Sequence, residues 1–198
     1  MEESTEKLQQ IRRQYGQVWV GIPMTKRQKK EAFGASRQIQ KMKAVSEVFF
    51  KEICELGVPV IVEADGARRM PCKVPAAHEP VIVPRTTTVC SVYGLDAIGQ
   101  RICDCCFRAE LAAEILGKRE TDRLEAADLA KISADGNGGC KGVLRGMEHW
   151  VILNKADTDQ RKESAEEVCR ELERYGNRRI LITSSEENER SERLVQKQ

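Results

Sequence analysis

Residues 150–157 constrain the fold of this chain more than any other segment. A short apolar run, residues 150–153, leads directly into the polar loop Asn154-Lys155-Ala156-Asp157, and a helical pattern follows from about residue 160 to residue 175. A strand, a loop and an amphipathic helix in this order are typical of the repeating unit of a parallel sheet covered by helices. The segment therefore predicts an α/β fold with a polar loop at the carboxyl end of a strand.

Strand and helix patterns alternate along the rest of the chain. We predict further strands at residues 18–22, 58–62, 86–93 and 179–183, and further helices at residues 3–16, 37–56, 104–116 and from residue 121 onward. The β-branched run at residues 58–62 is typical of a strand that is buried on both faces. We expect one α/β domain over residues 1–185, built as a three-layer sandwich with a mainly parallel sheet. A polar tail, residues 186–198, follows it.

The charge balance excludes two large classes of partner. The 198 residues include 33 basic and 31 acidic side chains, which leaves a net charge of +2. This charge is too small to predict binding to nucleic acid or to a membrane surface. No apolar run approaches the roughly 18–20 residues that cross a bilayer, and the residues after Met1 do not resemble a signal peptide. We therefore expect a soluble, cytoplasmic protein whose partners bind at local sites.

The eight cysteines do not form an obvious framework. Four of them, at positions 54, 72, 90 and 169, stand alone in mostly apolar patterns, whereas Cys103, Cys105 and Cys106 form a Cys-x-Cys-Cys run with Cys140 far downstream. Zinc sites usually space their ligands as Cys-x2–4-Cys and use four of them. Reduced thiols explain this pattern better than a zinc or redox site, and the role of the run stays open. His78 and His149 also lack companion ligands.

The Asn154 loop has the composition of a reader of guanine. Guanine offers two hydrogen-bond donors on one edge, its N1–H and its exocyclic amine, and the Asp157 carboxylate can accept from both. Lys155 would lay its aliphatic stem along the base, and Asn154 would tie neighbouring loops together. A later strand ends at Ser184, where GTPases keep a second base-reading loop. The alternative is a helix start capped by Asp157 or Asp159.

A second pair of carboxylates follows the run at residues 58–62. Glu63 and Asp65 come directly after this predicted strand, which is the Walker-B arrangement of a magnesium-binding carboxylate. Many strands end in Asp only because Asp-Gly makes a turn, so that interpretation stays open beside the magnesium site.

A phosphate loop of the form Gly-x-x-x-x-Gly-Lys-Ser/Thr does not occur in the sequence. The segment 135–142, Asp-Gly-Asn-Gly-Gly-Cys-Lys-Gly, is similar in composition, but it follows a predicted helix and has no Ser or Thr after its lysine. We interpret it as a surface turn.

The residues from Val62 to Ile82 carry a resemblance to a known family. They read Val-Glu-Ala-Asp-Gly-Ala-Arg-Arg-Met-Pro-Cys-Lys-Val-Pro-Ala-Ala-His-Glu-Pro-Val-Ile. This run resembles the YqeC family, accessory proteins of selenium-dependent molybdenum hydroxylases. The run at residues 94–99 and the Asn154 loop continue the resemblance, which covers roughly residues 17–185. Its motif residues in this chain are Gly66, Ala67, Arg68, Lys73, His78, Glu79, Pro80 and Asp96.

The family resembles P-loop NTPases, and this chain departs from it in two places. The strand and phosphate loop that begin the family's pattern are absent, so we expect either a late start or split gene, or a truncated paralogue that has lost triphosphate chemistry. A sheet without that strand would expose a long flat edge. We therefore expect a truncated chain or a fold that a partner completes. Phe107-Arg108 stands where many relatives have His-Arg, which weakens a catalytic role for that segment.

The resemblance implies an accessory protein for maturation of a selenium-dependent molybdenum hydroxylase, binding a guanine nucleotide with magnesium. Hydrolysis by this chain alone is not expected, since phosphoryl transfer depends on the electrostatic support of the missing loop. One alternative is a carrier of the molybdenum cofactor, whose pterin ring offers the same donor pair as guanine. The other is a non-catalytic interaction protein that binds a hydroxylase subunit or another copy through the exposed sheet edge and the basic residues 26–30.

Overall fold

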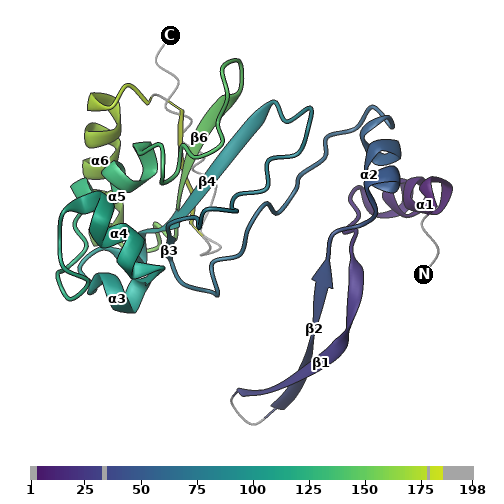
Figure 1. The fold of residues 1–198 in the computed structure, drawn as a ribbon, viewed down its shortest axis with the longest axis horizontal. Coiled ribbons are helices and arrows are strands. Elements are labelled where there is room, and N and C mark those ends of the chain that lie inside the picture. The colour runs from purple at the N-terminus through teal and green to yellow at the C-terminus, as the bar shows by residue number, and fades with distance from the viewer. Residues whose placement is uncertain (1–3, 33–34, 178, 185–198) are drawn as a thin grey trace. The chain divides into compact units, whose positions relative to one another are not determined.

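A computed structural model describes residues 4–32, 35–177 and 179–184 of the chain (Figure 1), and within residues 23–41 it describes the backbone alone. The chain divides into two compact units, Met1–Val62 and Glu63–Gln198. A single domain over residues 1–185 stays a prediction. The predicted tail at residues 186–198 and the basic side chains of residues 26–30 lie outside the described part.

Two helices of the first unit begin at serine caps. The Ser4 hydroxyl accepts a hydrogen bond from the Lys7 amide at the start of α1 (Thr5–Tyr15), and Ser46 accepts one from the Phe49 amide at the start of α2 (Glu47–Cys54). Each serine satisfies an amide that a helix start leaves unpaired. A small apolar core joins the two helices through Leu8, Phe49 and Ile53.

An antiparallel hairpin lies between these two helices in the sequence. Its strands are β1 (Ile22–Ala32) and β2 (Ala35–Lys43). The predicted helix at residues 37–56 is therefore wrong in its first half, because the pairing with β1 takes precedence over a helical spacing of apolar residues. Only its second half is helical, from the cap at Ser46 onward. The predicted strand at residues 18–22 is also wrong except at its last residue, where β1 begins.

The β-branched run at residues 58–62 is not a strand in the structure. Strand formation needs a neighbour that takes up the backbone amides and carbonyls, and no described strand pairs with this run. Ile61 is 98% exposed, and Val60 and Val62 are also exposed. The prediction of a strand buried on both faces is therefore wrong for this structure.

The second unit is built on a three-stranded parallel sheet. Its strands are β4 (Thr88–Gly94), β6 (Glu148–Asn154) and β7 (Ile180–Ile182), in the order β4-β6-β7. All three were predicted from their apolar runs, and the α/β class is confirmed. In the register Gly94 lies beside Asn154, and Leu153 lies beside Ile182. The carboxyl ends of the three strands therefore meet at one edge of the sheet.

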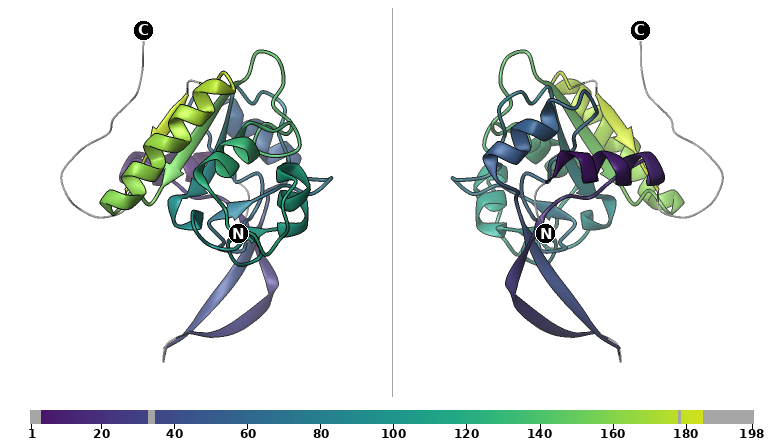
Figure 2. Two further views of the ribbon diagram at one scale, coloured as in Figure 1. Left: turned by 90° about the vertical axis from the view of Figure 1, so that its left-hand side faces the viewer. Right: turned by 90° about the vertical axis from the view of Figure 1, so that its right-hand side faces the viewer.

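Helices α5 (Ala126–Ala134) and α6 (Asp159–Arg174) lie on one side of this sheet (Figures 1 and 2). The covered face is the hydrophobic core, with Val151 and Leu153 of β6 fully buried against residues of α6 such as Val168 and Leu172. The predicted helix at residues 160–175 is confirmed almost to its ends. The helix predicted from residue 121 begins later, at Ala126. A three-layer arrangement and a P-loop NTPase-like topology stay predictions.

The predicted helix at residues 104–116 is interrupted. The structure has a short helix α3 (Ile102–Cys105), a two-residue strand β5 (Cys106–Phe107) and then α4 (Ala109–Leu116), which ends at Gly117 as expected. Strand β5 pairs in parallel with β3 (Cys72–Lys73). Arg108 has a left-handed backbone with φ of 66°, which a continuous helix does not allow. A short 3-10 helix, η1 (Leu95–Ala97), follows β4.

The described part of the chain contains no helix that is both long enough and apolar enough to cross a membrane.

Candidate functional site

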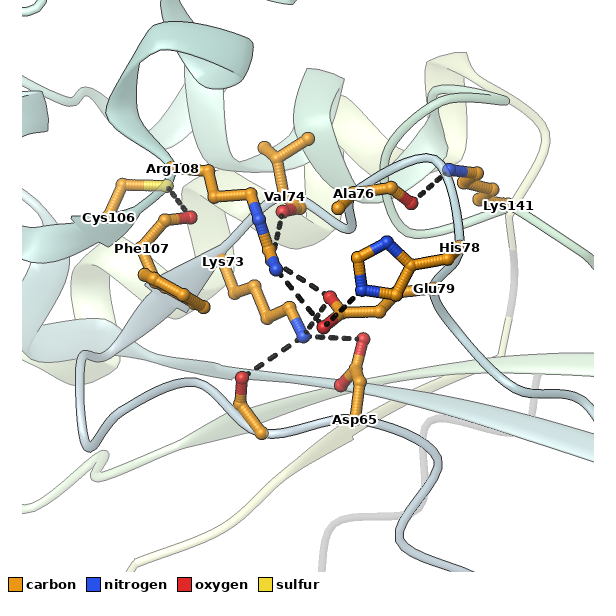
Figure 3. Close-up of polar contacts among 11 residues, drawn as sticks. Asp65, Lys73, Val74, Ala76, His78, Glu79, Cys106, Phe107, Arg108 and Lys141 are labelled. Atoms are coloured by element: carbon orange, nitrogen blue, oxygen red, sulfur yellow. Dashed lines mark hydrogen bonds and ion pairs between the residues drawn. The ribbon is translucent and has the colours of Figure 1, made fainter.

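The pairing of β3 with β5 brings Arg108 to three charged side chains of the segment from residue 65 to residue 79 (Figure 3). The Lys73 ammonium lies 2.6 Å from a Glu79 oxygen and 2.9 Å from an Asp65 oxygen. It also donates to the Gly66 carbonyl oxygen at 3.0 Å. Lys73 is only 9% exposed and Glu79 only 18%. We name Asp65, Lys73, Glu79 and Arg108 the ion cluster.

Arg108 completes the ion cluster by binding the same carboxylate, that of Glu79. Its guanidinium donates to both carboxylate oxygens, at 2.8 and 3.1 Å, and also to the Val74 carbonyl oxygen at 3.3 Å. Such a two-point contact between a guanidinium and a carboxylate is stronger and more directional than a single ion pair. The left-handed conformation at Arg108 turns the chain from β5 into α4 at the residue that makes this contact.

The electrostatics of the ion cluster favour the charged form of Glu79. Burial by itself would raise the pKa of this carboxyl, but the hydrogen bonds from Lys73 and Arg108 outweigh burial and lower the pKa to about 2. Glu79 is therefore a carboxylate throughout the physiological range. The residues between 63 and 87 carry only the two-residue strand β3, and the ion cluster joins this segment to the turn at Arg108.

An aromatic ring lies beside the ion cluster. The guanidinium groups of Arg68 and Arg108 lie 4.7 and 4.3 Å from the centre of the Phe107 ring, and the Lys73 ammonium lies 5.9 Å from it. Cations over an aromatic face are attracted by its negative quadrupole. Arg68 and Arg69 are both left-handed, in a turn closed by a hydrogen bond from the Met70 amide to the Ala67 carbonyl. Phe107 therefore holds a strained, positively charged turn against β5.

His78 lies at the outer rim of the ion cluster. Its Nε2 atom is 3.9 Å from Glu79, and its side chain is 80% exposed (Figure 3). Lys141 reaches the same segment from another part of the chain and donates to the Ala76 carbonyl oxygen. Pro80 follows Glu79 through a cis peptide bond. The motif from Gly66 to Pro80 is thus one connected site.

The second group of predicted residues lies at the carboxyl ends of the parallel strands. The Asn154 side chain accepts hydrogen bonds from the Lys155 amide at 2.8 Å and from the Thr183 hydroxyl at 3.0 Å. The Ala156 amide donates to the Thr183 carbonyl oxygen. These contacts tie the loop after β6 to the end of β7, as the sequence predicted for Asn154. Residues 154–157 with Thr183 and Ser184 are named the strand-end loop site.

Asp157 and Ser184 meet in the strand-end loop site. The Ser184 hydroxyl donates to Asp157 at 2.7 Å, and Arg161 of α6 lies 3.5 Å from the other carboxylate oxygen. The cap of α6 is Thr158, whose hydroxyl accepts from the Arg161 amide. Thr158, and not Asp157 or Asp159, therefore caps this helix.

Lys155 links the strand-end loop site to the end of β4. Its backbone is left-handed, with φ of 67°, and its ammonium lies 2.6 Å from an Asp96 oxygen. The other Asp96 oxygen is buried and has no hydrogen-bond partner among the described residues. A side chain at Gly94 would collide with this oxygen, so the absence of a Cβ there makes room for Asp96. Three strand ends are therefore joined through four polar side chains: Asp96, Asn154, Lys155 and Thr183.

Comparison with known proteins shows the family of the chain. The family model described as "YqeC protein" matches residues 2–110, which is more than half of the chain. The chain belongs to the YqeC family. A curated Escherichia coli (strain K12) protein named "Uncharacterized protein YqeC" is 25% identical over 130 residues, which are 65% of this chain and 51% of that protein. The chain thus spans about half the length of this YqeC relative. No solved structure matches it.

The match to the YqeC family model contains the ion cluster, since Asp65, Lys73, Glu79 and Arg108 all lie within residues 2–110. The sequence alone did not single out Arg108 as a site residue. Phe107, which stands where many relatives have His, was interpreted as weakening a catalytic role for the segment. The signal that could have located Arg108 is the acidic Glu79, which needs a basic partner when it is buried. The strand-end loop site lies beyond the matched residues.

The predicted magnesium ligands are not arranged as a metal site. Glu63 is exposed, and one Asp65 oxygen lies 2.9 Å from the Lys73 ammonium, so a positive charge already lies beside this carboxylate. The described residues contain no group of three or more His, Cys, Asp or Glu side chains that could hold a metal ion. The donors present therefore do not fit magnesium in this conformation of the chain.

The Cys-x-Cys-Cys run is part of the core and its margin. Cys105 and Cys106 are buried, and Cys106 lies beside Cys72 in the pairing of β3 with β5. Cys103 is only partly buried, and its thiol lies 3.6 Å from Asp104. Burial raises the pKa of Cys105 to about 12, so this thiol is protonated at neutral pH. All eight cysteines are free thiols.

Proposed function

We propose that this YqeC-family chain binds a guanine-type base at the strand-end loop site and serves in this way as an accessory protein for maturation of a selenium-dependent molybdenum hydroxylase. The observation that carries the proposal is the contact between Asp157 and Ser184 at 2.7 Å. It supports a base site because it puts an acceptor carboxylate beside the backbone of a second loop, at the shared edge of β6 and β7.

Asp157 has the acceptor capacity that the base requires. A carboxylate offers about four lone-pair positions, so the N1–H and the amine of guanine can bind beside the contacts with Ser184 and Arg161, or replace them. An adenine base presents no such donor pair on that edge. In this proposal Asp157 selects the base and Asn154 holds the loop in place. The aliphatic stem of Lys155 packs against the face of the base.

In this proposal the chain binds the base of a nucleotide and does not hydrolyse its phosphates. The sequence has no Gly-x-x-x-x-Gly-Lys-Ser/Thr run, and the carboxylate predicted to hold magnesium is paired with Lys73. Without these groups a triphosphate lacks most of the electrostatic support that phosphoryl transfer uses. No step of the proposal passes through magnesium.

Calorimetry with GDP, ADP and a stable pterin tests the proposal on the 198-residue chain. We expect GDP to bind at least about tenfold more tightly than ADP, with the same affinity in magnesium and in EDTA. Equal affinity for GDP and ADP would contradict base recognition, and tight binding that needs magnesium would contradict the absence of phosphate chemistry. A pterin has the same donor pair as guanine, so preference for the pterin over GDP would make the chain a carrier of the molybdenum cofactor.

A partner subunit is the second part of the proposal. Strand β4 lies at the edge of the described sheet, and Val92 on that strand is 57% exposed. Parallel sheets are usually covered on both faces and continue beyond three strands. We infer that a hydroxylase subunit or a second copy extends the sheet at β4. Light scattering during size exclusion tests this: a strict monomer at high concentration contradicts pairing between copies.

A further inference from the structure

A third group of polar side chains lies on the parallel sheet and the loops beside it, apart from the ion cluster and the strand-end loop site. It consists of Ser91 on β4, His149 near the amino end of β6, Cys140 in the loop before β6, and Asn177 before β7. His149 is the centre: its Nε2 atom lies 3.0 Å from the Ser91 hydroxyl, and its Nδ1 atom lies 3.4 Å from both the Cys140 sulfur and the Asn177 side-chain nitrogen.

The glycine-rich segment that resembles a phosphate loop in composition places Cys140 in this group. The Gly139 amide donates to the Ile132 carbonyl oxygen at 2.8 Å, and the Cys140 amide donates to the Asp135 carbonyl oxygen at 3.1 Å, so the loop folds back on the end of α5. A side chain at Gly138 would collide with the Ile132 carbonyl, and one at Gly139 with the Ser133 carbonyl. The two glycines therefore allow a close contact that fixes the position of the thiol.

The hydrogen bonds of Ser91 determine which nitrogen of His149 carries the proton. The Ser91 hydroxyl donates its hydrogen to the Gly139 carbonyl oxygen at 2.8 Å, so toward His149 it can only accept. Nε2 must then carry the hydrogen. Burial lowers the pKa of His149, and a hydrogen bond to Gly139 opposes this only in part, so the ring is neutral at pH 7. Its lone pair is therefore on Nδ1.

Two donors face this lone pair. The Asn177 side-chain oxygen accepts from the Arg179 amide at 3.0 Å, which fixes the orientation of the amide and directs its nitrogen toward Nδ1. The other donor is the Cys140 thiol, whose alternative acceptor, the Ser133 carbonyl oxygen, is farther away at 3.6 Å. A neutral imidazole lone pair within hydrogen-bond reach of a thiol is the arrangement in which the ring can remove the thiol proton.

We propose that Cys140 is a modification site that exchanges with small disulfides, with His149 as its base. Nδ1 of His149 takes the Cys140 proton, and the thiolate attacks one sulfur of the disulfide. A bond forms between that sulfur and Cys140, the bond between the two disulfide sulfurs breaks, and the leaving thiolate receives the proton from His149. The products are a mixed disulfide on Cys140 and one free thiol, so the disulfide is the only oxidant required.

Among the described residues, Cys140 is the one thiol with a hydrogen bond to a histidine, while Cys54, Cys103 and Cys169 are partly buried as Cys140 is. Cys90 is more exposed than Cys140, but no described histidine contacts it, and Cys72, Cys105 and Cys106 are almost completely buried. Burial also raises the pKa of Cys140, and the nearby Asp135 adds to the rise, so its thiolate is scarce at rest. Exchange at Cys140 therefore depends on proton transfer to His149, whereas exchange at Cys90 depends on exposure alone.

Timed reaction of the whole chain with glutathione disulfide, followed by mass mapping of each cysteine, tests the proposal. We expect Cys140 to be modified at least about tenfold faster than Cys90 in the unmodified sequence, although Cys90 is more exposed. His149→Asn keeps an acceptor near Nδ1 but cannot take a proton, and we expect it to slow Cys140 by about tenfold or more and leave Cys90 unchanged.

Two results would overturn the proposal. One is a Cys140 rate no higher than that of Cys90, which needs no variant and so decides the matter even if His149→Asn fails to fold. The other is an unchanged Cys140 rate in a folded His149→Asn protein, with folding judged by its melting curve against that of Cys140→Ser.

Discussion

The ion cluster and the strand-end loop site are both made of charged and amide side chains, but they are assembled in opposite ways. The ion cluster joins residue 73 on a two-residue strand, residue 108 in a turn, and residues 65 and 79 in segments without regular secondary structure. The strand-end loop site stands on β6 and β7, whose backbones are already fixed by the sheet register. In the first, charge contacts hold the backbone in place, and in the second the backbone holds the charged groups.

This difference assigns the two sites different roles. Contacts that fix a segment with little secondary structure contribute to folding, so their loss should appear as lost stability. Polar groups on a rigid sheet edge can be changed with little effect on folding, and their loss should appear in binding. The ion cluster is therefore expected to stabilise the fold of residues 63–87, and the strand-end loop site to recognise a ligand.

Glu79→Gln should have the largest effect on stability. It leaves Lys73 and Arg108 without a carboxylate in a mostly buried environment, and breaking such a pair costs about 3 kcal/mol. Urea unfolding followed by circular dichroism measures the change. Asp104→Asn, at an exposed pair with Arg101, is the matched control and should leave the midpoint unchanged. A Glu79→Gln protein as stable as the parent would break the distinction between the two sites.

Acid should reveal the same contact. The pKa of Glu79 is about 2 in the folded chain and 4.5 ordinarily. Between these values the unfolded chain binds more protons than the folded chain, so stability is present above pH 4.5 and falls as pH drops toward 2. The loss is about 1–3 kcal/mol after screening by solvent. Unfolding curves at stepped pH should show a steeper decline for the parent than for Glu79→Gln, and parallel declines would contradict the assignment.

Asn154→Ala should have a smaller effect that sharpens the comparison. It removes the acceptor shared by the Lys155 amide and the Thr183 hydroxyl, which costs about 1–2 kcal/mol of stability. Because the loop loses its tie to β7, GDP affinity should fall by about tenfold as well. Thr183→Val removes one of the two contacts and should lie between Asn154→Ala and the parent in both measurements. A change in stability with no change in GDP binding would contradict a role for Asn154 in binding the ligand.

Arg161→Ala should have the smallest effect. Its nitrogen is 3.5 Å from Asp157, and both groups are partly exposed, so the pair contributes less than about 1 kcal/mol to stability. GDP affinity should change by less than about threefold, since Asp157 keeps its contact with Ser184. A large loss of affinity would mean that Arg161 itself contacts the ligand.

The sequence was sufficient to place the residues of the strand-end loop site because each strand that carries them lies in an apolar run that the sequence shows. The apolar runs of β4, β6 and β7 specify three parallel strands, and parallel strands bring their carboxyl ends to one edge without further information. The position of Asn154, and of Asp157 opposite Ser184, follows from that rule. The loop's contact with Asp96 was not predicted, since it depends on the reach of the Lys155 side chain.

The ion cluster could not be predicted in the same way. Strands β3 and β5 have two residues each, which is too short for a pattern of apolar spacing, and the pairing of Cys72 with Cys106 spans more than thirty residues of chain. For the run at residues 58–62 the pattern was present but the strand was not. Its composition is that of a strand, but strand formation depends on a neighbour that composition does not specify. Local pattern predicts elements, whereas these two features depend on long-range pairing.

The most direct test of base recognition is a change of ligand preference at Asp157. Xanthine carries an oxygen where guanine carries its amine. In Asp157→Asn the affinity for GDP should therefore fall by about 10–100-fold, and the affinity for xanthosine diphosphate should rise because the new amide can donate to that oxygen. The control Asp159→Asn alters a carboxylate that is 93% exposed and should bind both ligands as the parent does. Calorimetry of the three proteins with both diphosphates gives the answer. Reversed preference in Asp157→Asn alone is the predicted result, and unchanged preference in that variant would contradict a guanine site at the strand-end loop.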